Sequence, residues 1–308
     1  MKKHHFITAV LVTCLIAHGF SQDTTDNAEM DEREFRFHVS NFSVSAGVYP
    51  EKLTRATLVG FEKLAPNSAL ISDIYALPDY NNVNNYFFNN DVTRALVFNL
   101  GFDFPDYGKK HVAKPRLNLG LSYHKSMLKS LNIRHESSEP YDTLSSETTD
   151  NVVYLDSVTQ HRYDMYYYSE QIRLDANFIY RSDPAKRFSF YVGAGISAGF
   201  SINAYSTISY ERNKFVSSSS ESGSYVYTYQ YHEPVVQKNE RFTHKMNIGC
   251  MAYIPLGLDF RIGNKKSLWT ELHLFIELRP GVNLVYIPEL TTYTYGIFQR
   301  NFGVKYEW

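Results

Sequence analysis

Long apolar runs are missing from this sequence after its first 20 or so residues. No later stretch reaches the roughly 18 consecutive apolar residues that indicate a membrane-spanning helix, and the mean hydropathy is -0.34. The sequence therefore excludes a helical membrane protein.

Cysteine and an excess charge of either sign are nearly missing too. The two cysteines are Cys14 and Cys250, and Cys14 lies in the N-terminal apolar run, so the expected mature chain can form neither an intramolecular disulfide nor a thiolate metal cage. The formal net charge is -1, whereas nucleic-acid binding requires a strongly basic face. We expect no nucleic-acid partner.

The N-terminal residues have the layout of a signal peptide. Lys2 and Lys3 precede an apolar run from Phe6 to Ala17, and small residues follow. The run is shorter than the roughly 20 residues of a membrane helix. We expect a signal peptide over 1–21, cleaved after Ser21, and a short acidic segment over 22–33. Lipidation of Cys14 is not expected, because the residue lies inside the apolar run.

Aromatic residues are abundant, with 25 Tyr and 21 Phe. Aromatic and β-branched residues in short alternating runs are typical of strands. From about residue 34 onward, segments of period two recur, which places one set of side chains on each face of a strand. Eight such segments are predicted, at 34–49, 94–105, 112–127, 166–181, 187–204, 244–262, 267–284 and 296–308.

The connections between these segments alternate in length. Short polar turns, "DYGKK", "SDPAK" and "GNKKS", follow the second, fourth and sixth segments, and longer stretches follow the others. Transmembrane barrels show this asymmetry, with short periplasmic turns and long outer loops, whereas a soluble sandwich has no reason to. The prediction for 34–308 is an all-β fold, an eight-stranded antiparallel transmembrane β-barrel with long extracellular loops. A hairpin in 50–93 would make ten strands.

Residue type assigns the two faces of each strand. Charges facing lipid cost a few kcal/mol near the membrane midplane, so the charged side of each segment must face the lumen. In the seventh segment, for example, Leu274 and Ile276 face outward. The first segment changes phase between Val39 and Phe42, which predicts a β-bulge near Ser40.

The inward face contains ionisable residues of both signs, and an eight-stranded barrel is just wide enough for side chains to fill it. We predict a lumen ion-pair network in a probably closed lumen, because an unpaired charge there would be strongly penalised. A narrow ion path through Glu271, His273, Glu277 and Arg279 is the alternative. The predicted network consists of Arg36, Asp103, Arg116, Arg173, Asp175, Asp259, Arg261, Glu271, His273, Glu277, Arg279, Lys305 and Glu307.

The last ten residues, "QRNFGVKYEW", alternate until the chain stops on an aromatic residue. This end resembles the C-terminal signal of outer-membrane barrels, and the chain resembles the small porin-like outer-membrane β-barrel family related to the OmpA barrel. The resemblance implies outer-membrane lipid and the barrel-assembly machinery as partners, and the outer membrane of a Gram-negative bacterium as location, with both termini periplasmic. The residues of the implied C-terminal assembly signal are Phe298, Phe302, Val304, Tyr306 and Trp308.

The long loops carry the remaining signals. In loop one, Leu53, Leu58, Phe61 and Leu64 predict one face of a short helix. Loops two and three, 128–165 and 205–243, are rich in Ser, Thr and Tyr, residues suited to adaptable recognition. The alternation from Tyr225 to Tyr231 predicts that loop three prolongs its strands as a hairpin. An extracellular partner, unidentified, is expected there.

An enzyme and a metal protein are the other classes considered. Ser122, His124 and Ser126 lie near the top of the third segment, with His232 and His244 near the sixth, but spacing alone does not make a nucleophile–base pair. The histidines and loop aspartates lack metal-site spacing. We expect no catalytic residue, no cofactor and no metal. The predicted function is a structural or surface-interaction role in the outer membrane; the alternatives are a narrow pore for ions or small solutes and a lipid-modifying enzyme.

Overall fold

The computed structural model describes residues 38–50, 56–77, 92–104, 114–145, 152–182, 186–220, 225–231, 234–263 and 268–308. All of them belong to the unit Phe37–Trp308, and the unit Met1–Arg36 contains none. The expected signal peptide over 1–21 and the acidic segment over 22–33 lie outside the described residues.

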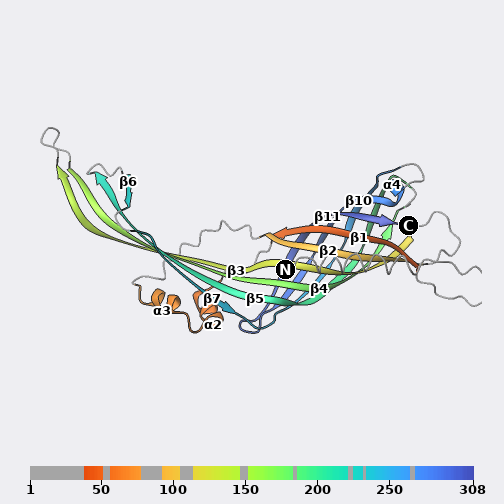
Figure 1. The fold of residues 1–308 in the computed structure, drawn as a ribbon, viewed down its shortest axis with the longest axis horizontal. Coiled ribbons are helices and arrows are strands. Elements are labelled where there is room, and N and C mark those ends of the chain that lie inside the picture. Colours follow the sequence, from red (N-terminus) through yellow and green to blue (C-terminus); the bar gives the residue numbers. More distant parts are fainter. Residues whose placement is uncertain are drawn as a thin grey trace, which may run out of the picture. The chain divides into compact units, whose positions relative to one another are not determined.

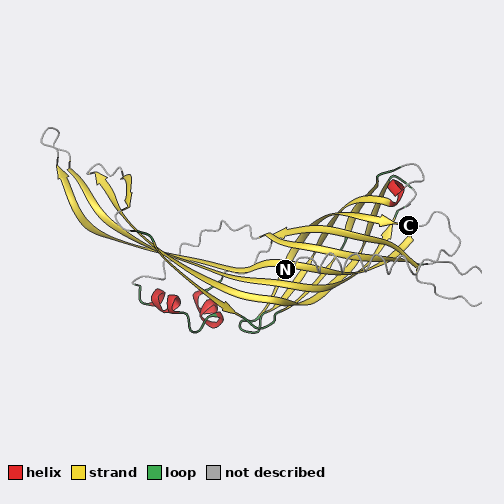
Figure 2. Ribbon diagram, viewed as in Figure 1, coloured by secondary structure: helices red, strands yellow, loops and turns green. Residues whose placement is uncertain are grey.

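Antiparallel strands form a closed ring (Figures 1 and 2). In ring order they are β1 (His38–Pro50), β2 (Val92–Asp103), β3 (Lys114–Ser145), β4 (Val152–Arg181), β5 (Phe188–Ser220), β8 (Ile248–Tyr253) with β9 (Leu256–Arg261), β10 (Leu272–Tyr286) and β11 (Thr292–Glu307). Pairing of β11 with β1 closes the ring. β8 and β9 both lie between β5 and β10, so they occupy one strand position. The ring therefore has the eight strand positions that the alternating segments predict.

The sixth strand position is interrupted between β8 and β9, but the interruption still hydrogen-bonds to both neighbouring strands. Ile254 and Pro255 separate β8 from β9, since proline has no N–H to donate to a sheet. The backbone amide of Ile254 instead donates to the carbonyl of Pro280 at 2.9 Å, and the carbonyl of Pro255 accepts from the amide of Gly193 at 3.1 Å. The chain therefore remains bonded to β10 and to β5 across the interruption.

Side chains alternate between the two faces of the ring as predicted. On β4, Arg173 and Asp175 are buried, whereas Leu174 between them is 70% exposed. The register of β1 shifts between Val39 and Asn41, which confirms the bulge near Ser40. The seventh predicted segment needs one correction: its first residues form a single helical turn, α4 (Leu268–Glu271), before β10 begins.

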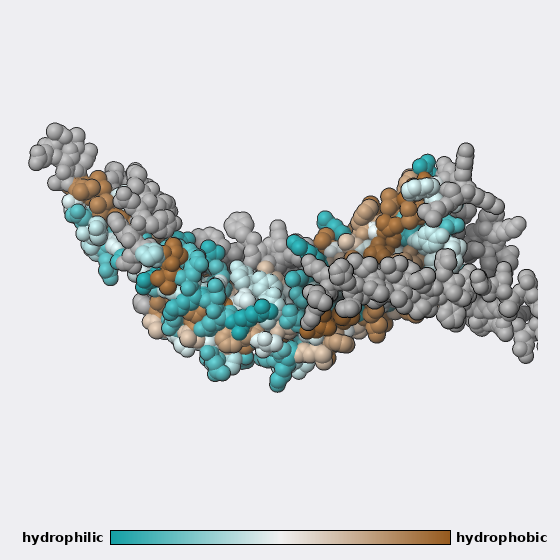
Figure 3. Space-filling view, in the orientation of Figure 1, coloured by the Kyte–Doolittle hydropathy of each residue, from teal (hydrophilic) through white to brown (hydrophobic). Residues whose placement is uncertain are grey.

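The outer wall is an apolar belt with an aromatic rim at one end. Hydrophobic side chains gather over the barrel strands in the space-filling view (Figure 3). Phe190, Ile196 and Phe302 of the outer face are each more than half exposed. We call the end where β1 begins and β11 ends the terminal end, and the opposite end the loop end. Aromatic side chains mark the terminal end, namely Phe104, Tyr180, Phe188, Phe260, Tyr306 and Trp308. In the part of the chain that the structure describes, no helix has the length and apolar content to span a membrane.

Three strands continue well past the loop end of the ring. β2 pairs with β3 only as far as Lys125, but the β3–β4 and β4–β5 ladders run on to Ser145 and Ser220. β6 (Tyr225–Tyr231) and β7 (Val236–Thr243) pair with β5, which confirms the predicted hairpin of loop three. We call residues 128–145, 152–165 and 205–220 with β6 and β7 the arm; the extension of loop two as paired strands was not predicted.

Loop one contains two short helices. The Thr57 and Ser68 hydroxyls cap α2 (Leu58–Leu64) and α3 (Ala69–Tyr75), each accepting a hydrogen bond from a backbone amide at 3.1 Å. Such caps satisfy amide groups that a helix start leaves unpaired. The helix predicted from Leu58, Phe61 and Leu64 is confirmed over α2. Leu53 lies outside the described residues, as does 78–91. Because β1 pairs directly with β2 along its whole length, a hairpin in 50–93 would not add strands to the ring.

The two helices, which we call the helix cap, pack on the lumen-side face of the arm. Phe61, Leu64, Leu70, Ile71 and Ile74 are buried there in one hydrophobic cluster. Its other buried members include Leu131, Met165, Tyr167, Ile208, Val285 and Ile287. The cluster thus joins β3, β4 and β5 to the end of β10, across the loop end of the barrel. The carboxylate of Glu240 in β7 fixes the cap by accepting from the Ser68 hydroxyl at 2.5 Å.

Replacing Phe61 with Ala should detach the helix cap. Truncation of a buried phenylalanine costs about 3–5 kcal/mol, more than two short helices can recover elsewhere. Hydrogen exchange in 56–77 should become faster, with the barrel still folded by its heat-modifiable gel mobility. Val59→Ala on the exposed side of α2 is the matched control; equal exchange in the two variants would contradict the packing.

Candidate functional site: the charged lumen

The lumen face of the terminal end holds a continuous chain of ion pairs. Arg116 of β3 binds Asp103 of β2 through two hydrogen bonds of 2.6 and 2.9 Å, a bidentate geometry that strengthens the pair. Its Nη2 also donates to Glu307 of β11 at 2.9 Å. Arg181 of β4 donates to the same Glu307 at 2.7 Å and pairs with Asp259 of β9 at 3.1 Å.

Lys305 and His273 complete this layer. The Lys305 ammonium pairs with Asp259 and, at 3.2 Å, with Glu307, and Nδ1 of His273 lies 2.7 Å from Asp259. Glu307 therefore binds three cationic side chains that come from β3, β4 and β11. The second-last residue of the chain holds one end of the barrel together across its interior.

A second layer of charge lies closer to the loop end. Arg279 of β10 donates to Glu277 at 2.5 Å and to Asp175 of β4 at 3.1 Å. Each carboxylate also accepts from a buried phenol, Glu277 from Tyr191 at 2.9 Å and Asp175 from Tyr253 at 2.7 Å. The Arg279 guanidinium lies 4.6 Å from the centre of the Tyr253 ring. This guanidinium thus has two carboxylate partners and an aromatic ring on one face, which suits an arginine that is only 2% exposed.

Above this layer the partners of the lumen cation are amides instead of carboxylates. Arg173 has two amide partners, Gln171 at 2.8 Å and Asn283 at 3.2 Å, and within the described residues it has no ion pair. Asn247 accepts from Gln171 at 2.6 Å and donates to Tyr167 at 3.1 Å. From the terminal end to the loop end, the interior therefore passes from ion pairs to hydrogen bonds with amide side chains, and then to the apolar cluster under the helix cap.

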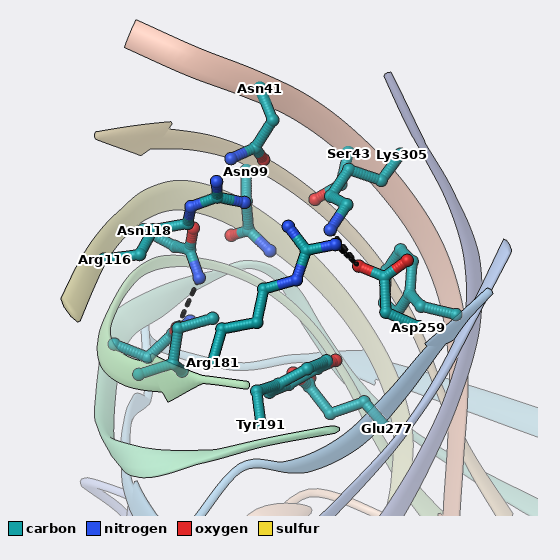
Figure 4. A pocket seen from close by; sticks show the side chains of 13 residues that line it. Asn41, Ser43, Asn99, Arg116, Asn118, Arg181, Tyr191, Asp259, Glu277 and Lys305 are labelled. Carbon is teal, nitrogen blue, oxygen red and sulfur yellow. Dashed lines mark hydrogen bonds and ion pairs between the residues drawn. The ribbon is translucent and has the colours of Figure 1, made fainter. Parts of the chain in front are cut away.

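The space between the two charged layers is small. Arg181, Tyr191, Asp259, Glu277 and Lys305 point toward one another across it (Figure 4). The cavity there is about 30 Å³, which holds about two water molecules. No small-molecule substrate fits in this cavity.

Three side chains of the terminal layer have the donor set of a metal site. Ligand atoms of Asp259, His273 and Glu307 lie within 4.8 Å of one another. However, the Lys305 ammonium pairs with both carboxylates, and Arg181 does so as well. These two cations already supply the positive charge that a metal ion would bring, so the group does not fit a metal.

The structure places most of the predicted lumen residues in these layers. Arg36 lies outside the described residues. Arg261 is on the lumen side of β9, opposite His273, and its Nε has no hydrogen-bond partner in the described chain. Glu271 is a correction: it ends α4, and its carboxylate accepts from the hydroxyl of Tyr306, a residue of the outward face. The turn at α4 breaks the alternation that assigned Glu271 to the lumen.

Sequence reasoning missed Arg181, Tyr191 and Tyr253. Arg181 is the last residue of β4, beside a polar turn, where an arginine is as easily read as part of the turn. The two tyrosines looked like the other aromatic residues of the wall. Each tyrosine lies two residues after a buried residue of its strand, Ser189 or Met251. This spacing places its side chain on the lumen face and is the signal that could have found it.

The Ser–His residues considered for catalysis are partly brought together. Nε2 of His124 lies 2.9 Å from the Ser122 hydroxyl, and Nδ1 lies 3.3 Å from the hydroxyl of Tyr49. The histidine is 1% exposed, and its orienting partner is a phenol rather than a carboxylate. The other candidates lie apart from this pair. The Ser126 hydroxyl accepts a hydrogen bond from Thr93, and His244 lies beside Ser206. His232 is outside the described residues. The pair is buried on the lumen side of β3.

Comparison with known proteins gives weak likenesses. No protein-family model matches the sequence, and no curated protein sequence does. Among solved structures, the chain is similar to Ail, the attachment invasion locus protein of Yersinia pestis, in complex with the heparin analogue sucrose octasulfate, at 9% identity and a TM-score of 0.24, over 88% of this chain and 100% of that one. The outer membrane channel DcaP of Acinetobacter baumannii is similar at 8% identity and a TM-score of 0.17, over 92% and 100%. TM-scores this low do not support an inference about this chain. The barrel assignment therefore depends on the closed ring and the apolar outer wall.

Replacing Glu307 with Gln should strongly destabilise the barrel. The change leaves Arg116, Arg181 and Lys305 in the lumen with one carboxylate fewer, and breaking a buried ion pair in this way costs about 3–5 kcal/mol. Urea unfolding of the protein refolded in detergent measures the loss. Glu136→Gln, which removes an exposed pair with Arg134 on the arm, is the control and should cost under about 1 kcal/mol; similar losses in the two variants would contradict the role of Glu307.

Proposed function

We propose that this protein resides in the outer membrane of a Gram-negative bacterium, where a closed barrel anchors an arm that binds an extracellular partner. The length of three strands carries the proposal. β3, β4 and β5 have 32, 30 and 33 residues, whereas a tilted strand crosses a membrane in about 9–11. More than half of each strand is therefore available outside the membrane.

The orientation follows from the connections. The links from β2 to β3, β4 to β5 and β9 to β10 are short and lie at the terminal end, whereas the helix cap and the arm lie at the loop end. Outer-membrane barrels keep short turns in the periplasm and long loops outside. Both termini are then periplasmic, and the arm is extracellular.

Three features support a closed lumen. The ion pairs at the terminal end cross the interior, the cavity above them is about 30 Å³, and the helix cap packs against Val285 and Ile287 at the loop end. A water-filled ion path needs continuous polar space, and the apolar cluster of the cap opposes it. A sealed barrel serves as an anchor rather than as a pore.

The C-terminal assembly signal is part of the same proposal. Phe298, Phe302, Val304 and Trp308 are each more than 40% exposed on the outer wall, and β11 is the strand that closes the ring with β1. These side chains are accessible to the barrel-assembly machinery until the strand inserts in lipid.

The binding surface that we favour is the part of the lumen-side face of the arm that borders the helix cap. There Tyr210 packs against the buried Tyr163 at a ring distance of 4.8 Å, and the Tyr210 hydroxyl lies 3.0 Å from Nδ1 of His161. Lys238 pairs with Tyr210 across the sheet, and Arg212 pairs with His161. Burial, with His135 and Arg212 nearby, lowers the pKa of His161, so at pH 7 the positive charge comes from arginine and lysine.

The opposite face of the arm differs in its charge. Arg134 pairs with Glu136 at 3.3 Å, and Arg162 pairs with Asp164 at 2.9 Å. These two cations therefore have acidic partners on their own face. The face with Arg212 and Lys238 combines aromatic rings with cationic side chains. An acidic ligand such as a sulfated glycan suits that chemistry.

The refolded full chain should be electrically silent in planar bilayers. Side chains of the two charged layers and the helix cap leave no continuous path for ions. Single-channel recording at 1 M salt checks this, after a heat-modifiable gel shift has shown a folded barrel. A steady current altered by Glu277→Gln or Arg279→Gln would replace the anchor with a narrow pore.

Binding through the arm can be tested with dextran sulfate as the probe and neutral dextran as its control. The variant with Arg212→Gln and Lys238→Gln should bind dextran sulfate at least tenfold more weakly, because it loses two charges from one face. The matched variant, with Arg134→Gln and Arg162→Gln, loses the same charge from the opposite face and should change affinity less than threefold. Equal losses in both, or none, would contradict the assigned face.

A further inference from the structure

Arg300 interrupts the apolar side of the last strand. It lies between Phe298 and Phe302, both exposed on the outer wall, and it is exposed itself. Its guanidinium carbon lies 5.6 Å from the centre of the Phe298 ring. A charge facing hydrocarbon is costly except near the membrane interface, so this position requires an explanation.

Two further cations lie in the same hydrogen-bonded row across the sheet. Val48 of β1 pairs with Arg300 on one side and with Arg94 of β2 on the other. Arg94 in turn pairs with Lys125 of β3. Residues in one row point to the same side of a sheet, and Arg94, Lys125 and Arg300 are all exposed on the outer wall. We call these three residues the basic row.

The basic row lies near the loop-end edge of the apolar belt. Arg300 is eight residues from Trp308, and Arg94 is ten residues from Phe104, aromatic residues that mark the terminal end. At about 3.4 Å per residue and a tilt of about 40°, these separations give heights of about 21 and 26 Å. Since the apolar band of such barrels is about 25 Å tall, the row lies at the level of lipid head groups.

Two of the three cations of the row have no acidic partner among the described residues. Lys125 pairs with Glu170 at 3.1 Å, while Arg94 and Arg300 form no ion pair with the described residues. From β11 to β3 the row spans three strand spacings, or about 14 Å. A head group with two separated phosphates matches this span better than one with a single phosphate, and arginine binds phosphate in a bidentate manner.

We propose that the basic row is a lipid-binding site on the outer wall, which holds the phosphate groups of lipopolysaccharide in the outer leaflet. The site is separate from the ligand-binding face of the arm. It rests on the proposed orientation only in that the loop end must face the outer leaflet. Bound glycolipid would neutralise Arg94 and Arg300 and fix the barrel at its depth in the membrane.

The experiment measures binding of lipopolysaccharide by the refolded full chain with native mass spectrometry. The variant with Arg94→Gln and Arg300→Gln should bind at least tenfold more weakly than the unchanged protein, and phosphatase-treated lipopolysaccharide should bind weakly to both. The variant with Arg94→Lys and Arg300→Lys should retain most of the binding. Arg187→Gln, an outward arginine packed on Phe260 at the terminal end, is the matched control and should not change it.

Three outcomes would overturn the site. Unchanged binding by the Gln variant would remove the role of Arg94 and Arg300, and an equal loss in Arg187→Gln would show general attraction to outward arginines. An equal loss of phosphatidylglycerol binding would assign the row to phospholipid. A tag inserted between Ser145 and Val152 and labelled on intact cells reports orientation separately, so that failure of the proposed orientation is distinguishable from failure of the lipid site.

Discussion

The interaction on which the rest of the structure depends is the binding of three cations by Glu307. Arginine and lysine side chains inside a narrow barrel need charged or hydrogen-bonding partners there, because removal of a charge from water costs several kcal/mol. Glu307 and Asp259 meet this requirement for Arg116, Arg181 and Lys305, and they connect β3, β4, β9 and β11 across the interior. The pairing connects the last strand to β3 and β4 across the interior at the terminal end.

The period of two along that last strand gives its two faces separate tasks. Glu307 and Lys305 face the lumen, whereas Tyr306 and Trp308 face outward with rings 5.8 Å apart. Arg300 shares the outward side, eight residues further from the end, where the belt meets the head groups. One short segment thus contributes to lumen charge balance, to the outer wall and to the basic row.

Period-two alternation made the ring, its faces and the β1 bulge predictable from the sequence. It also located most of the lumen charges, since those lie at every second position of long strands such as β4. It failed where the chain leaves that period. Glu271 sits in the turn of α4, Arg181 ends a strand beside a turn, and the arm is polar on much of both faces, so loop two gave no contrast to predict from. Which cation meets which carboxylate depends on contacts between strands far apart in sequence, which no local pattern encodes.

The most direct measurement is a double-mutant cycle between Arg181 and Glu307 in the refolded protein. The free energy of unfolding is measured for the unchanged protein, for Arg181→Gln, for Glu307→Gln and for the double variant. Residues in one ion-pair network couple by about 0.5–3 kcal/mol, and a coupling above about 1 kcal/mol is expected here. A coupling near zero would show that the lumen is held by packing alone, and would contradict the central role of Glu307.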